Sequence, residues 1–138
     1  MAANEEMNEL RVRLCPLAED VASGFDVTLD YSEASVEHVE RILGEVHNNY
    51  LTTHSEEGMR GIALEFGAYL VTVLERHYGP VVWKRDHPTI GGETFPVYWR
   101  GTTLFPYGWG LKRIFDGPGD EICSKWEACV VQRAKPQS

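Results

Sequence analysis

The segment from residue 56 to residue 78 restricts the possible folds most, because it is apolar on two opposite sides at helical spacing. The two sides are formed by Met59, Ile62, Phe66, Leu70, Val73 and Leu74, and by Leu64, Ala68 and Val71. Ser55 stands at a helix N-cap position, Glu56 and Glu57 suit a first turn, and Gly79-Pro80 supplies a stop. A helix that is apolar on both sides is usually buried between layers. We therefore predict one continuous, mostly buried helix at the centre of the domain.

Three glycines, Gly58, Gly61 and Gly67, lie within this segment. Each costs about 1 kcal/mol relative to alanine inside a helix. We expect the close approach of another backbone to explain them.

The N-terminal region has weaker patterns. Residues 8–23 favour a short helix, although part of this stretch also alternates as a strand does, and Pro16 interrupts either pattern. Residues 25–31 alternate apolar and polar side chains after Gly24, which is typical of a short strand with one solvated face. We predict a short helix followed by a short strand.

The next segment predicts an amphipathic helix that ends near residues 48–49. Ser32 and Ser35 are both candidate N-caps, and the apolar residues after them recur at steps of three and four. The same pattern places Glu37 and Glu40 outward.

After residue 80 the pattern changes to short strands separated by glycine and proline. Residues 81–84, 94–100 and 102–105 are predicted strands, with Gly101 at the turn of a hairpin. Helix is predicted again around residues 109–115 and from 120 to about 133. This order indicates a single α+β domain over residues 1–138. We expect N-terminal helices packed on a small antiparallel sheet, about residues 81–106, that is closed by C-terminal helices.

Charge is unevenly distributed along this chain, whose formal net charge is −8. Residues 1–79 hold 15 acidic and 5 basic side chains, whereas residues 80–138 hold 6 acidic and 8 basic ones. A net-negative chain repels phosphate backbones, which argues against nucleic acid and anionic membranes as partners. A basic protein partner fits better, and acidity that serves only solubility is the alternative.

The three cysteines, Cys15, Cys123 and Cys129, are an odd number and cannot all pair within one chain. Because no export signal is visible at the N-terminus, we expect a soluble cytoplasmic protein whose cysteines stay reduced. Buried structural roles are the favoured interpretation for Cys123 and Cys129.

Sequence motifs for catalysis and cofactor binding are absent. The chain has no phosphate-binding glycine loop, dinucleotide fingerprint, nucleophile elbow or zincin motif. Its histidines form no tight ligand pair and its cysteines lack C-x-x-C spacing. We therefore expect no metal and no cofactor, and a role without catalysis is the favoured interpretation.

Glu65 is the one charged residue between Gly61 and Leu74, and Tyr69 follows it by one helical turn. A partly buried carboxylate with a raised pKa is able to bind a cation or act as an acid or base. The alternative is structural: Glu65 emerges at the helix edge or pairs with Arg100 or Lys112.

Aromatic residues are dense after residue 80, and exposed ones among them are candidates for a binding surface. The candidates are Trp99 and Trp109 with the nearby cations Lys112 and Arg113. Tryptophan, tyrosine and arginine contribute much of the binding energy in protein interfaces. An aromatic core with a solvated rim is the alternative.

Several segments resemble a family of small uncharacterised bacterial α+β proteins. They are Phe66-Gly67-Ala68-Tyr69-Leu70, Arg76-His77-Tyr78-Gly79, Lys112-Arg113, Gly117-Pro118 and Lys125-Trp126, with Leu29-Asp30-Tyr31-Ser32 before them. Such proteins are similar in size to immunity proteins that neutralise toxins. The resemblance implies a shared fold and transfers no catalytic residue.

Two hypotheses about function follow. The first is a non-enzymatic protein-binding module, immunity- or adaptor-like, whose acidic half meets a basic partner. The second is a small-molecule-binding domain or enzyme that uses Glu65 and Tyr69 in a pocket walled by aromatic residues. The oligomeric state is left open.

Overall fold

The computed structural model describes residues 2–135, with side chains described from residue 5 onward. The α+β class is confirmed: helices predominate, and a small antiparallel sheet lies between them in the chain. The elements in order are α1 (Ala2–Gly24), η1 (Glu33–Ser35), α2 (Val36–Thr53), α3 (Met59–Tyr78), β1 (Val82–Trp83), β2 (Val97–Trp99), β3 (Thr102–Leu104), α4 (Pro106–Asp116), η2 (Pro118–Asp120), α5 (Ile122–Trp126), η3 (Glu127–Val131) and α6 (Gln132–Ala134).

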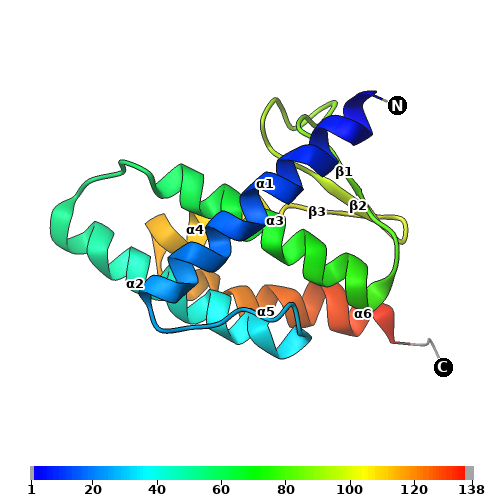
Figure 1. Cartoon of the computed structure of the whole chain (residues 1–138). Coiled ribbons are helices and arrows are strands. Elements are labelled where there is room, and N and C mark those ends of the chain that lie inside the picture. Colours follow the sequence, from blue (N-terminus) through cyan, green and yellow to red (C-terminus); the bar gives the residue numbers. More distant parts are fainter. Residues whose placement is uncertain (1, 136–138) are drawn as a thin grey trace.

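Helix α3 is the central element, as the apolar pattern on its two sides predicts. It packs against α1 and α4, and Figure 1 shows α1 crossing over it. Phe66, Tyr69 and Val71 are completely buried. The helix begins at Met59 rather than at residue 56, because Gly58 adopts a left-handed conformation with φ 77°, which a right-handed helix cannot contain.

Gly67 explains part of the glycine pattern in α3. A Cβ atom at Gly67 would lie 3.2 Å from backbone atoms of Tyr107 in α4, and one at Gly110 would lie 3.3 Å from Ala63. The two helices therefore approach each other at a glycine on each helix, which confirms the expected close approach for Gly67 and not for Gly58 or Gly61. Gly61 is different, since the nearest atom to its Cβ position is a Glu65 carboxylate oxygen at 3.9 Å.

We predict opposite outcomes for valine at these two glycines. Gly67→Val should lower the free energy of unfolding by about 1 to 3 kcal/mol, because the new side chain meets α4 backbone that cannot rotate away. Gly61→Val should leave stability unchanged or slightly raised, since it replaces a poor helix former at an exposed position. Urea unfolding of both variants measures the difference, and equal stabilities would contradict the proposed helix contact.

The N-terminal region partly departs from expectation. Helix α1 is longer than predicted and includes Pro16. Pro16 removes one hydrogen bond to the residue four positions earlier, Val12, and both residues are exposed. Residues 27–30 do alternate between buried and exposed side chains, but they form no strand. The predicted strand is wrong because this segment has no partner strand among the described residues.

Helix α2 begins as predicted and runs past residues 48–49 to Thr53. The Ser32 hydroxyl accepts a hydrogen bond from the Ser35 N–H at 3.2 Å, which caps the helical turn η1. Glu37 is exposed as expected. The outward prediction for Glu40 is wrong: its carboxylate forms an ion pair at 2.9 Å with Arg113 of α4.

The sheet has the order β1-β2-β3 with both pairs antiparallel. Trp99 pairs with Thr102, and the turn between them consists of Arg100 and Gly101 at φ 47° and 74°, the conformation that a two-residue hairpin requires. The hairpin prediction is confirmed, although β2 begins at Val97 rather than at residue 94.

The last predicted helix is interrupted in its hydrogen-bonding pattern. Residues Glu127–Val131 form a π-helical turn between α5 and α6. Such turns are rare and are often found near functional sites. Here the turn lies between two grooves that are described below.

Candidate functional site

Tyr69 is a structural residue. Its side chain is fully buried, and its hydroxyl accepts a hydrogen bond from the Tyr31 N–H at 2.9 Å. The Ser35 hydroxyl donates to the Ser32 carbonyl, so the Tyr69 hydroxyl donates to Ser35 Oγ at 2.7 Å. Burial raises the pKa of Tyr69. The residue ties α3 to the segment before α2 and is closed to ligands.

Glu65 is half-buried, and burial raises the pKa of its carboxyl. Among the described residues it forms no ion pair with Arg100 or Lys112. It therefore lies at the helix edge, one turn from a tyrosine that solvent does not reach. The two residues do not make an open pocket together.

Trp99 and Arg113 also lie in the interior. Trp99 is 2% exposed, and its indole N–H donates to the Tyr78 carbonyl at 3.2 Å. Arg113 is 8% exposed and is paired with Glu40. Neither side chain is available to a partner, so the expected exposed cluster does not form around them.

Trp109 and Lys112 line an aromatic groove of about 620 Å³ beside the start of α4. Its other walls include Ile90, Phe105, Tyr107 and Leu111. Ile90 is 61% exposed. These two residues are the part of the predicted aromatic surface that a partner can reach.

A second groove is acidic and lies between the start of α2 and the C-terminal helices. It has a volume of about 360 Å³. Three glutamates, Glu33, Glu37 and Glu127, line it together with apolar side chains that include Val36, Trp126 and Val131. We call this the acidic groove.

Glu33 is held in place by two donors. Its Oε2 accepts hydrogen bonds from the Trp126 indole N–H at 2.9 Å and from the Tyr78 hydroxyl. Burial, together with the hydrogen bond to this carboxylate, raises the pKa of Tyr78 to about 12. Tyr78 therefore remains a neutral donor at physiological pH. The two hydrogen bonds hold the Glu33 carboxylate in a fixed position at the lining of the acidic groove.

Cys123 lines the acidic groove. Burial raises the pKa of its thiol, and the carboxylates of Glu40, Glu37 and Glu121 raise it further. Cys123 and Cys129 are both half-buried. The prediction that both cysteines are buried is therefore wrong. Cys15 is buried.

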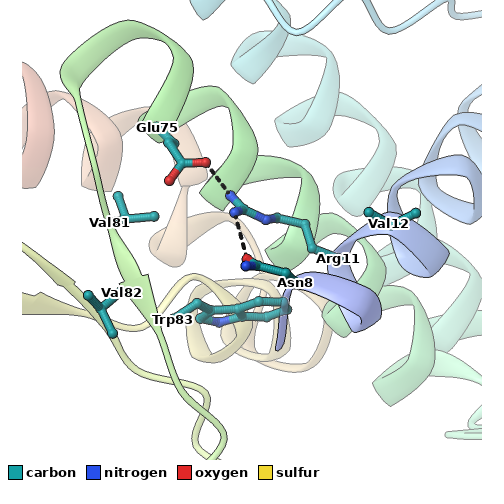
Figure 2. A pocket seen from close by; sticks show the side chains of 7 residues that line it. All are labelled: Asn8, Arg11, Val12, Glu75, Val81, Val82 and Trp83. Atoms are coloured by element: carbon teal, nitrogen blue, oxygen red, sulfur yellow. Dashed lines mark hydrogen bonds and ion pairs between the residues drawn. The ribbon is translucent and has the colours of Figure 1, made fainter. Parts of the chain in front are cut away.

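A third groove lies between α1, the end of α3 and β1, and Figure 2 shows its lining. Arg11 reaches across it to the Glu75 carboxylate at 3.0 Å and donates to the Asn8 side chain at 3.2 Å. The charges inside are already paired with each other. This arrangement joins α1 to α3 and offers a partner little free charge.

The part of the chain that the structure describes contains neither a metal-ligand cluster nor a membrane-spanning helix. No group of three or more His, Cys, Asp or Glu side chains there is arranged to hold a metal ion. No helix among the described residues has the length and apolarity needed to cross a bilayer.

Comparisons with family models, curated proteins and solved structures gave no match to this chain. The family resemblance found in the sequence therefore stays a prediction. The interpretation of the site depends on its own geometry.

Sequence reasoning missed the acidic groove because its three carboxylates come from distant positions. Glu33 and Glu37 precede or begin α2, whereas Glu127 is more than eighty residues later. Only the excess of acidic residues in the first half pointed toward this surface. The predicted residues Glu65, Tyr69, Trp99 and Arg113 do not line the acidic groove.

Proposed function

We propose that this protein is a non-enzymatic binding module whose acidic groove receives a lysine or arginine side chain of a basic partner protein. The observation that supports this proposal is that Glu33, Glu37 and Glu127 line one groove together with apolar side chains. Long cationic side chains bury their aliphatic stems on apolar surface and keep the charged head beside carboxylates.

The net charge supports the same proposal. At −8 the chain attracts basic proteins over a distance and speeds their encounter. The aromatic groove with Trp109 provides a second surface of a composition that is common in interfaces. Long-range attraction and short-range contact are thus supplied by different residues.

An immunity protein or an adaptor works in this way, and the resemblance in the sequence favours that class. A bacterial origin and a cytoplasmic location belong to the same proposal. The alternative, an enzyme or small-molecule-binding domain that uses Glu65 and Tyr69, has less support because Tyr69 is closed to solvent and its hydroxyl is already hydrogen-bonded.

Paired charge-neutral variants test the proposal with a partner recovered by pull-down from the native cell. We expect Glu37→Gln with Glu127→Gln to speed dissociation about tenfold, because a bound cation loses its counter-charges. The matched control, Glu9→Gln with Glu57→Gln, changes the net charge equally at exposed positions outside the groove. It should only slow association, and less so as salt is added.

Association and dissociation rates are measured over a range of salt concentrations by surface-based kinetics. Equal dissociation rates for the groove pair and the control pair would show that the acidic groove is not the contact site. A partner without net positive charge would contradict the proposal that the acidic chain attracts a basic protein.

A further inference from the structure

A fourth groove differs from the rest of the molecule in its charge. It has a volume of about 670 Å³ and lies between the β2–β3 hairpin and the C-terminal helices. Arg100, Arg133 and Lys135 line it, and no Asp or Glu of the described residues does. We call it the basic groove. In a chain with 21 acidic and 13 basic side chains, three cations without a carboxylate are a marked local excess.

These cations are not neutralised by neighbours in the described part of the chain, because none of the three is in an ion pair there. Arg100 is held by a hydrogen bond to the Tyr78 carbonyl at 3.0 Å and by the ring of Trp99. Arg133 donates to the Arg100 carbonyl at 3.4 Å. Both hydrogen bonds end on backbone carbonyls, so they hold the two side chains without neutralising their charge, and a bound anion would supply the missing counter-charge.

A neutral donor is available beside the cations. Thr102 and Thr103 both contribute to the lining of the groove, and because successive side chains of a strand point to opposite faces, one of the two hydroxyls faces it. Both threonines belong to β3, which is an edge strand of the sheet. Hydroxyl and guanidinium donors are the groups that bind phosphate and carboxylate oxygens.

We propose that the basic groove binds a small-molecule oxyanion with two or more negative charges. The three cations lie in one hollow of a size typical for small ligands. A nucleic acid would need an extended basic surface, and this chain is net acidic elsewhere. This site is separate from the acidic groove of the proposed function and is independent of it.

Two cysteines provide a matched pair of reporters for this proposal. Cys129 lines the basic groove, whereas Cys123 lines the acidic one. The variant Cys123→Ser leaves Cys129 as reporter, and Cys129→Ser leaves Cys123. Cys15 is buried in both.

Each variant is reacted with two disulfide reagents at low ionic strength. One is dithiobis-nitrobenzoate, which is a dianion, and the other is dithiodipyridine, which is uncharged at neutral pH. In both reactions the thiolate attacks the reagent disulfide and releases the reagent thiolate. The ratio of the two rate constants cancels differences in thiolate fraction, so it reports the local preference for a dianion.

We expect this ratio to be at least about tenfold higher for Cys129 than for Cys123, since a cationic hollow concentrates anions. Pyrophosphate should slow the dianionic reagent at Cys129 more than sodium chloride of equal ionic strength does. Citrate, tested in parallel, distinguishes a phosphate site from a site for any multivalent carboxylate or phosphate.

Arg133→Gln with Lys135→Gln, in the Cys123→Ser background, should reduce both the ratio and the protection. Arg13→Gln with Lys84→Gln is the control, because it removes equal charge at exposed positions outside the groove. Equal ratios for the two cysteines would overturn the proposal. So would a high ratio without protection by pyrophosphate or citrate beyond that of sodium chloride, because it would show a positive potential and no bound anion.

Discussion

Glu40→Ala should lower the free energy of unfolding by about 3 kcal/mol, because it leaves the Arg113 cation buried without a counter-charge. The Arg113 Nε–H donates to both Glu40 carboxylate oxygens, at 3.1 and 2.9 Å. The same carboxylate accepts the Ile122 N–H at 2.8 Å, at the start of α5. Glu40 therefore joins α2 to α4 and α5, and its removal breaks both connections.

The burial of Arg113 makes the loss larger than for a surface ion pair. The side chain of Arg113 is 9% exposed and that of Glu40 is 20% exposed. Arg113 Nη1 is buried and has no hydrogen-bond partner among the described residues, so Glu40 is the main compensation for the charge. Exposed pairs contribute at most about 1 kcal/mol.

Glu37→Ala is the matched control, since it removes a glutamate that is exposed on the same helix. It should change stability by less than about 0.5 kcal/mol. Urea unfolding followed by circular dichroism measures both variants. If the two losses are equal, the Glu40–Arg113 pair does not stabilise the fold as the geometry indicates.

Leu70→Ala should cost about 2 to 5 kcal/mol, as large-to-small substitutions in a core do. Leu70 is 1% exposed in the middle of α3, which packs against α1 and α4. The cavity would open at the centre of the molecule, where neither neighbouring helix can move in without losing contacts of its own.

Leu51→Ala provides the comparison, because Leu51 is 54% exposed near the end of α2. Its loss should stay below about 1 kcal/mol. Both are measured by the same urea titration. A loss below about half a kcal/mol for Leu70→Ala would mean that the core does not depend on α3.

The sequence predicted α3 and the hairpin because each has a strong local signal. The end of α3 at Gly79 and the hairpin turn at Gly101 involve backbone conformations that glycine alone adopts easily. The predicted start of α3 is three residues too early because Ser55 resembles an N-cap. Its hydroxyl instead accepts the Glu57 N–H at 3.3 Å in the turn before the helix.

Local sequence patterns point to the candidate residues, but they do not determine whether the side chains of these residues are buried. Trp99 and Trp109 occur in similar sequence settings, yet the first lies in the core and the second lines a groove. Residues 27–30 are a second example. Their side chains do alternate between buried and exposed, but a strand forms only where a partner strand is available for hydrogen bonding.

The sequence alone determined the α+β class, the central buried helix and the excess of acid in the first half of the chain. These properties depend on hydrophobic periodicity, glycine positions and charge counts, which are local or additive. The tertiary structure decided that Glu40 turns inward to Arg113, and that Glu33, Glu37 and Glu127 form one acidic groove while Arg100, Arg133 and Lys135 form a basic one. Charge patterns within one helix do not reveal these groupings, because each of them brings together residues that the chain separates and packing alone makes neighbours.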